Sequence, residues 1–397
     1  MNFTYRLRNL FGLETKAITV VSPDDWADVF GSSPVASGVR VTPKTAMTCA
    51  PVRAAVQAIS EGIGQLPVHI YGRDGNGAKE RAPDHAAYKL LHDEANPWTP
   101  AAKFREEMTR DACLYPNGAF ARIVRVDGKP AELHRIDQEA DRVEVSSNDY
   151  GEPVYKVQTG KGDPEIVAYL DMLHIPSPSL NGEGVVHEAR EAIGLALILE
   201  KYAARLFGNG ARPGSLLIGK DIKTSEGAKN ARIAFNNQLK GDGQGSNVVL
   251  PGDFAYHPLT LTSTDAQFLE LRAFAIQEIS RFWRVPVHML GQLDRAIKSN
   301  VEQQANEFLT YCILPWVKRW EGEIRLKLFT PDERGTFFAE FLVDDIVRAD
   351  LAARYEAFSK AITSRILNPN EVRAMENRAP YAGGDTFENP NTSRGAV

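Results

Sequence analysis

The chain has 397 residues, of which 43% are hydrophobic and 24% are charged, and its formal net charge is -5. This length allows two or three packed modules, and the acidic balance is not typical of a protein that grips nucleic acid through a broad basic face.

Three cysteines, Cys49, Cys113 and Cys312, lie far apart, and no CxxC motif or Cys/His cluster accompanies them. We therefore expect buried, reduced thiols, with neither a disulfide framework nor a zinc site. The longest apolar run, residues 192–199, is much shorter than the ~20 residues that span a bilayer, so no membrane segment is expected. Residues 1–17 contain no apolar signal region, which favours a cytoplasmic, reducing origin.

The first half of the chain predicts an α+β fold after a loosely ordered arm, residues 1–45. A helix is expected to begin near Ala50 and to stop at Gly62–Gly64. A second amphipathic helix covers residues 100–115, and its run Arg105-Glu106-Glu107 is interpreted as a solvated face. Asp127-Gly128 predicts a hairpin turn. The strands expected in this half are 66–73, 118–126, 131–136, 142–145, 154–158 and 165–168.

The second half predicts longer helices. A helix over 186–207 ends at the glycines of 208–210, and a small α/β insert follows over 212–261. A helix that begins at Thr264, with Gln267 completing a capping box, ends before Pro286. One face of this helix carries Phe268, Leu271, Ala275, Ile279 and Phe282.

A third helix is expected over 301–329, where Pro315 removes one backbone hydrogen bond and should kink the helix without ending it. The strands expected in the second half are 215–219, 247–252, 257–261 and 336–343, and the last two helices are 349–363 and 370–377. Two long helices that flank an insert resemble a stalk more than the layout of a compact enzyme.

No motif in the sequence assembles catalytic chemistry. Residues 214–221 (GSLLIGKD) come close to a phosphate-binding loop, but Asp221 stands where Ser or Thr must bind magnesium, and the residues between the glycines favour a buried strand. The eight histidines form no HxxxH or HExxH pair, and no GxSxG elbow occurs. We therefore predict a protein that is not an enzyme, with no cofactor and no metal site.

Three stretches resemble the portal proteins of long-tailed bacteriophages, a family also found in prophages and gene transfer agents. They lie in family order within residues 92–143, 174–217 and 259–328. The third is the most specific, since it joins a DAQFLE helix to a VPVHMLG turn, a polar loop and an SNVEQQ helix start. The sequence departs from the family at residues 184–187 (GVVH), and the region after Val343 is short.

The resemblance implies a portal fold of α+β class, assembled as a ring of identical subunits that is dodecameric in the capsid. It divides the chain into an N-terminal arm (1–25), a wing (26–185 and 285–343), two stem helices (186–210 and 263–284), a clip (211–262) and a small crown with a C-terminal tail (344–397). The second part of the wing would contain a tunnel loop (291–300) and the kinked helix (301–329).

The function implied is a channel for packaging and ejecting double-stranded DNA, without sequence specificity, at the portal vertex of a virion assembled in the bacterial host cytoplasm. The implied partners are further copies of the chain, the major capsid protein, the terminase large subunit and the head–tail adaptor, and no membrane. The tunnel-loop residues are Gln292, Asp294, Arg295, Lys298, Ser299 and Asn300. The clip residues expected to dock partners are Lys220, Lys223, Lys229, Arg232 and Lys240. Another ring-forming head–tail connector and an NTP-binding enzyme are the alternatives.

Overall fold

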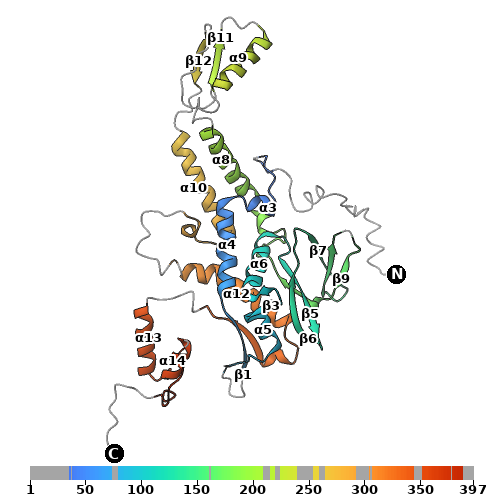
Figure 1. Ribbon diagram of the computed structural model, residues 1–397, viewed down its shortest axis with the longest axis vertical. Coiled ribbons are helices and arrows are strands. Elements are labelled where there is room, and N and C mark those ends of the chain that lie inside the picture. Colours follow the sequence, from blue (N-terminus) through green and yellow to red (C-terminus); the bar gives the residue numbers. More distant parts are fainter. Residues whose placement is uncertain are drawn as a thin grey trace, which may run out of the picture. The chain divides into compact units, whose positions relative to one another are not determined.

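The computed structural model divides the chain into two compact units, and Figure 1 draws their helices and strands. The first unit comprises residues 1–58, 110–119 and 176–292, and the second comprises residues 59–109, 120–175 and 293–397. The residues that the structure describes are 35–36, 38–73, 79–160, 162–208, 215–219, 224–238, 254–258, 264–291, 304, 306–343, 351–376 and 378–387.

Helices dominate the described part of the first unit. They are α3 (Pro43–Ala46), the first part of α4 (Ala50–Gln65), α7 (Val185–Glu188), α8 (Arg190–Gly208), α9 (Ser225–Gln238), α10 (Thr264–Trp283) and the short 3-10 helix η3 (Val287–Leu290). The helix expected over 186–207 is present as α7 and α8, because Ala189 between them leaves helical geometry at φ -87 and ψ 3.

Between α8 and α10 lies the predicted α/β insert. Its strands β11 (Ser215–Gly219) and β12 (Phe254–Pro258) pair antiparallel, with Ser215 opposite Pro258, and α9 lies between them in sequence. The strand expected over 257–261 was placed too late, since β12 begins at Phe254. The strand expected over 247–252 lies outside the described residues.

The second unit contains the three-stranded sheets of the described residues. Their strand orders are β13-β1-β2, β10-β5-β6 and β7-β8-β9, with a separate β3-β4 pair. The strands are β1 (Val68–Arg73), β2 (Lys79–Arg81), β3 (Glu94–Asn96), β4 (Thr99–Pro100), β5 (Ala119–Val126), β6 (Lys129–Arg135), β7 (Asp141–Ser147), β8 (Pro153–Thr159), β9 (Glu165–Val167), β10 (Met172–Ile175) and β13 (Phe337–Phe341). The helices are α5 (Ala86–His92), most of α6 (Ala101–Leu114, of which residues 110–114 belong to the first unit), α12 (Leu314–Lys327), α13 (Leu351–Thr363) and α14 (Pro369–Met375), with short turns η1 (Tyr169–Asp171) and η6 (Glu333–Gly335). Helices and strands are therefore mixed, as predicted.

A compact apolar cluster holds the central strands of the second unit together. The Phe120 ring stacks on His174 with 4.5 Å between ring centroids and meets Tyr155 edge-on at 5.8 Å. The buried members of the cluster are Phe120, Ile136, Val143, Tyr155, Val157, Val167 and Met172. Burying side chains of this size stabilises a fold by roughly 1.5–3 kcal/mol each.

The predicted hairpin at Asp127-Gly128 is confirmed. Asp127 has φ 51 and Gly128 has φ 77, and β5 and β6 pair antiparallel on either side, with Val126 opposite Lys129. Two consecutive residues with positive φ are what a two-residue hairpin turn requires, and Asp-Gly tolerates them.

The prediction that a helix stops at Gly62–Gly64 is wrong, because α4 continues through both glycines to Gln65. A β-carbon on Gly62 would lie 2.9 Å from Ile313 Cδ1, and one on Gly64 would lie 3.0 Å from Glu106 Cβ. These glycines therefore let residues of η5 and α6 approach α4 closely, and they do not terminate the helix.

The interpretation of Arg105 as part of a solvated face is also wrong. Its side chain is 3% exposed and donates hydrogen bonds to the backbone carbonyls of Leu91, Gly64 and Leu66. Burial lowers the pKa of Arg105 to about 10. The guanidinium thus supplies hydrogen-bond donors to backbone carbonyls at the end of α4 and near the end of α5. Without it these buried carbonyls would lack a donor.

The chain around Pro315 is helical on both sides, as expected, but the local form differs from the prediction. Residues Phe308–Ile313 form a π-helix, η5, which leads directly into α12 at Leu314. Phe308, Leu309, Cys312 and Ile313 of this turn are buried. Pro315 is the second residue of α12, a position that a proline tolerates because it lacks only a backbone donor.

The cysteine prediction is confirmed. Cys49, Cys113 and Cys312 are buried and form no disulfide, and burial raises the pKa of the Cys49 thiol to about 11. Among the described helices, none is both long enough and apolar enough to cross a membrane.

Candidate functional site: the paired long helices

Helices α8 and α10 pack side by side, with the insert connecting them (Figure 1). The Tyr202 and Phe268 rings meet across the pair, with 5.7 Å between centroids. The side chains that this pairing and the surrounding helices bury are Ile193, Leu199, Ala203, Ala275, Ile279 and Trp283. Their spacing follows one stripe on each helix, which is typical of two amphipathic helices that bury a common seam.

The chain that enters α7 is fixed by a polar loop. Ser179 Oγ lies 2.7 Å from Glu188 Oε1 and accepts hydrogen bonds from the backbone N–H groups of Gly182 and Gly184. Gly184 has φ 85 and ψ 148, and a β-carbon there would lie 2.7 Å from Pro116 Cα. Only glycine fits this position, so its close backbone contact fixes where α7, the short helix just before α8, begins.

The C-terminal end of α10 is stabilised by a turn directly after the helix. Arg284 takes a left-handed conformation at φ 56, and Ser280 Oγ donates a 2.7 Å hydrogen bond to the Val285 carbonyl. Pro286 follows directly, which agrees with the prediction that the helix ends before it.

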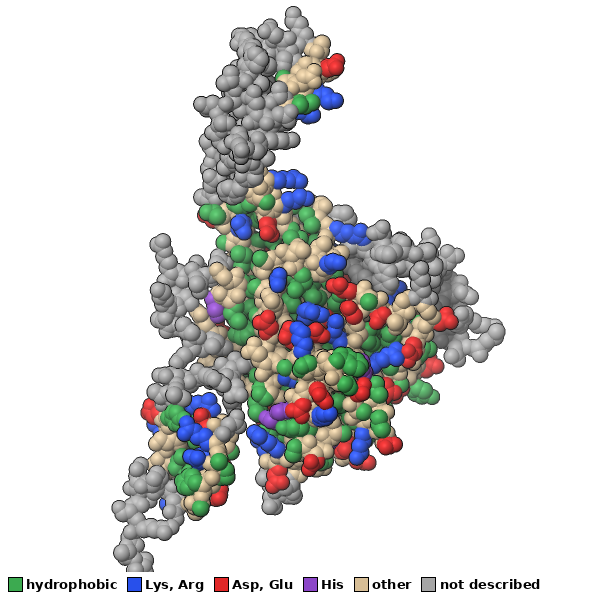
Figure 2. Space-filling model, in the orientation of Figure 1, with side chains coloured by type: hydrophobic (Ala, Val, Ile, Leu, Met, Phe, Trp, Pro, Cys, Tyr) green, Lys and Arg blue, Asp and Glu red, His purple; other side chains and the backbone are tan. Residues whose placement is uncertain are grey.

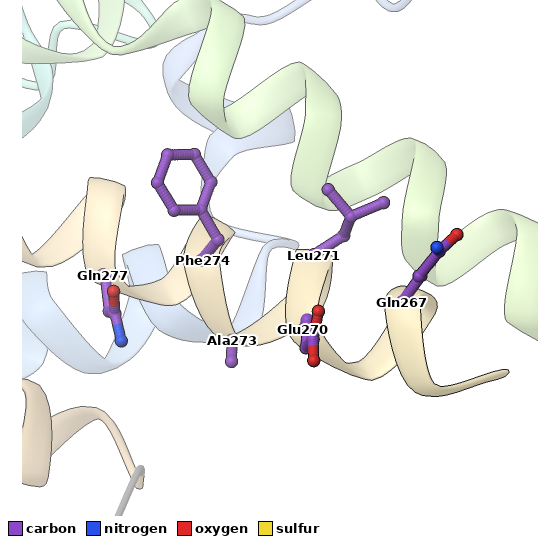
Figure 3. A pocket seen from close by; sticks show the side chains of 6 residues that line it. All are labelled: Gln267, Glu270, Leu271, Ala273, Phe274 and Gln277. Carbon is purple, nitrogen blue, oxygen red and sulfur yellow. The ribbon is translucent and has the colours of Figure 1, made fainter. Parts of the chain in front are cut away.

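A second stripe of α10 is exposed. It lines an open groove of about 600 Å³, and Figure 3 shows the side chains that line it: Gln267, Glu270, Leu271, Ala273, Phe274 and Gln277. Leu271 is 47% exposed, Phe274 is 48% exposed and Leu269, nearby, is 65% exposed. Glu270 is the one charged member of the lining.

The exposed stripe was not foreseen from the sequence. Leu271 and Phe282 were placed on one face with Ala275 and Ile279, yet only the latter two are buried. Phe274 was not singled out, although its spacing from Gln267 and Gln277 marks a face with few charges. Large exposed apolar side chains along one helix make this face a candidate interaction surface.

The structure describes only some of the predicted site residues. The whole predicted tunnel-loop set, Gln292 to Asn300, lies outside the described residues, as do Lys220, Lys223 and Lys240 of the insert. Lys229 and Arg232 are exposed on α9, three residues apart and therefore on one side of that helix. The structure thus brings two of the five predicted docking residues together.

Charge on the visible surface is mixed. In Figure 2 the described Lys and Arg side chains are interspersed with Asp and Glu, and no broad basic face is visible. This agrees with the acidic composition. Within the described ranges, no group of three His, Cys, Asp or Glu side chains could hold a metal ion.

Comparison with known proteins gives consistent relatives. The family model described as phage portal protein matches residues 50–377. The probable portal protein of Streptomyces phage phiC31 is 28% identical over 88% of this chain and 79% of its own length. The portal protein of Enterobacteria phage HK97 is 28% identical over 83% of this chain and 78% of its own length.

Solved structures with a similar fold include a chain in the neck of an empty gene transfer agent particle. It has a TM-score of 0.59 at 20% identity and covers 85% of this chain and 93% of its own. An HK97-family phage portal protein from Corynebacterium diphtheriae has a TM-score of 0.57 at 16% identity, over 77% of this chain and 96% of its own.

Proposed function

This chain belongs to the phage portal protein family, and we propose that its copies close into a ring, dodecameric in the capsid, at one vertex of a phage or gene transfer agent particle. Double-stranded DNA would enter and leave through the ring. The observation that carries this proposal is the family match over residues 50–377, which spans both long helices and the insert.

The exposed stripe of α10 supports ring formation. A ring of identical subunits needs a surface that repeats at a fixed rotation from one copy to the next. The groove with Leu271 and Phe274 offers apolar area with a single carboxylate, Glu270, which is the character of an interface centre. In this proposal α8 and α10 correspond to the stem, 186–210 and 263–284.

The finer assignments follow the family layout. The insert, 211–262, would form the clip that docks the terminase large subunit and later the head–tail adaptor, with Lys229 and Arg232 exposed for that contact. The wing, 26–185 and 285–343, would meet the major capsid protein, and 344–397 would form a small crown. The assembled ring would reside in the virion after assembly in the host cytoplasm.

DNA contact is assigned to the tunnel loop, 291–300. Asp294, Arg295 and Lys298 give each loop both signs of charge and a small positive excess. Repeated by symmetry, such loops would touch phosphates without reading sequence, and weak contacts let DNA slide under motor force.

An NTP-binding enzyme is disfavoured by the insert itself. The residues between Gly214 and Lys220 form the paired strand β11, in which backbone groups face β12 and do not cradle a phosphate. Another head–tail connector is disfavoured by the length of chain that the portal family matches.

Negative-stain imaging of the purified chain and of particles tests the proposal. We expect rings with a central channel. A protein that stays monomeric at every concentration and is absent from the capsid vertex would overturn the proposal.

Replacing Arg295 and Lys298 by Ala should leave rings intact while packaging or retention of DNA changes. Deleting residues 220–250 should abolish docking of terminase or adaptor while the second unit stays folded.

A further inference from the structure

A basic pocket lies within the second unit, between α12 and the sheet strand β13. Its volume is about 540 Å³. Glu321 is the one acidic side chain in the lining, and its Oε2 atom lies 2.7 Å from the Nζ atom of Lys318. The remaining positive charge comes from three arginines, so the pocket is cationic although the whole chain has a net charge of -5. The basic residues of the lining are Arg73, Lys318, Arg325 and Arg334.

The three arginines form no ion pair with a described acidic side chain. Arg73 lies over the Phe338 ring, 5.1 Å from its centroid. Arg325 donates a hydrogen bond to the Arg334 carbonyl, and Arg334 donates one to the Leu326 carbonyl at 2.8 Å. The Nε atom of Arg334 is buried and makes no hydrogen bond to a described residue. Since each guanidinium has five N–H donors, the pocket offers several of them to the oxygens of a carboxylate or a phosphate.

One edge of β13 forms a wall of the same pocket. In the described part of the chain, β13 is the outermost strand of the sheet β13-β1-β2. The Arg73 N–H donates to the Thr336 carbonyl, so the backbone groups of even-numbered residues in β13 face β1. Those of Phe337 and Ala339, which line the pocket, therefore point away from β1. They provide both donors and acceptors at the edge.

The wall that α12 contributes contains a glycine, Gly322. A glycine inside a helix makes the helix less stable than an alanine would. A β-carbon on Gly322 would meet nothing within 4 Å, so no described neighbour requires the glycine. A ligand that approaches the α12 backbone closely would explain it.

A strand edge beside arginines fits an extended acidic polypeptide better than a phosphate group. A phosphate would use the N–H donors and leave the edge carbonyls unpaired, whereas a second backbone pairs with both kinds of group. We propose that the α12–β13 pocket binds an extended acidic segment of another protein. The segment adds a strand to β13, and its carboxylates meet the arginines. The half-buried Phe337 and Phe338 supply apolar surface for its uncharged side chains.

Binding of short synthetic peptides to the purified full chain tests this proposal, with fluorescence anisotropy as the measurement. The probe is a capped, fluorescein-labelled hexapeptide that alternates glutamate and valine. Two analogues replace alternate backbone N–H groups by ester oxygens, either those of the glutamates or those of the valines. Because only alternate residues of a strand face its neighbour, one analogue should bind about tenfold more weakly and the other should bind like the probe.

Protein variants locate the binding at this pocket. Arg73→Glu/Arg325→Glu should weaken binding of the probe by about tenfold or more and strengthen binding of the matching lysine–valine peptide. The control is Lys103→Glu/Lys360→Glu, which makes the same change of charge at two exposed lysines outside the pocket. Gly322→Leu should fold, since the space around Gly322 is open, and should lose binding because the leucine fills the pocket.

Three results would overturn the proposal. In the first, the folded parent binds the glutamate and lysine peptides equally, or binds neither. In the second, both ester analogues bind as tightly as the probe, which would show attraction by charge without strand pairing. In the third, inorganic phosphate or short duplex DNA binds and is lost in Arg73→Glu/Arg325→Glu, while the peptide does not bind. Ring formation is read separately by imaging, so its failure would not affect these outcomes.

Discussion

Gly184 lies against Pro116 so closely that a β-carbon on the glycine would come 2.7 Å from Pro116 Cα. The contact is with backbone atoms, which cannot move away as a flexible side chain can. The glycine also holds φ 85 and ψ 148, a conformation that other residues rarely adopt. Two independent constraints thus act at the N-cap of α7, the short helix that precedes α8.

Gly184→Ala should therefore lower the free energy of unfolding by about 2–4 kcal/mol, the sum of backbone strain and steric displacement. Gly151→Ala is the matched control, because Gly151 has φ 81 but open space around its Cα. Its cost should stay near 1 kcal/mol. Urea midpoints of the two variants provide the comparison, and equal losses would show that the Pro116 contact is unimportant.

Phe274→Glu should prevent or weaken ring assembly. Phe274 is half-exposed on the α10 groove, and a carboxylate there would be buried without a partner if a neighbouring copy covers the groove. Leu269→Glu is the control, since Leu269 is more exposed and does not line the groove. Sedimentation of both variants measures the ring fraction, and rings in Phe274→Glu at parental yield would remove the groove from the interface.

Local sequence signals predicted the elements whose geometry is decided within a few residues. The Asp127-Gly128 turn is one, because two positive φ values are required there and only a few residue pairs supply them. Gly62 shows the opposite case. Its local pattern indicated a helix end, but the contact with Ile313, far away in sequence, decides its role.

For the candidate site, too, local sequence patterns predicted some features and missed those that depend on tertiary contacts. The two long helices and the insert follow from helical periodicity and glycine signals. Which face of α10 stays exposed depends on what α8 covers, and periodicity alone placed Leu271 with the buried side chains. The π-helix at Phe308–Ile313 also could not be predicted, because its register differs from that of an α-helix while its residue types do not.

Stability should decrease as the pH falls from about 6.5 to about 4, in part through His69. Burial, together with the charges of Arg81 and His92, lowers the pKa of His69 to about 4. At a pH between the ordinary pKa of histidine, about 6.5, and the lowered pKa in the folded protein, His69 is protonated in the unfolded chain and neutral in the folded one. The unfolded chain then binds one more proton, so the free energy of unfolding decreases as the pH falls. The full effect is on the order of 2–3 kcal/mol.

His69→Gln should flatten that part of the pH profile. The imidazole Nδ1 lies 3.3 Å from the Tyr88 hydroxyl, and glutamine retains a polar group without titrating in this range. Urea midpoints at pH 4.5 and pH 7 for parent and variant measure the difference. An unchanged slope would mean that His69 is not protonated on unfolding in this window.

Arg105→Met should be among the most destabilising single substitutions in the second unit. Methionine matches much of the apolar stem, yet it leaves the carbonyls of Leu91, Gly64 and Leu66 without the guanidinium donors. Losing hydrogen bonds from a buried charged group to such acceptors costs about 3–5 kcal/mol.

Lys103→Met on the same helix is the control, because Lys103 is exposed and makes a surface ion pair with Glu106. The free energy of unfolding of Lys103→Met should stay within about 0.5 kcal/mol of the parent value. If both variants unfold at the same urea concentration, the buried arginine does not hold α4 and α5 together.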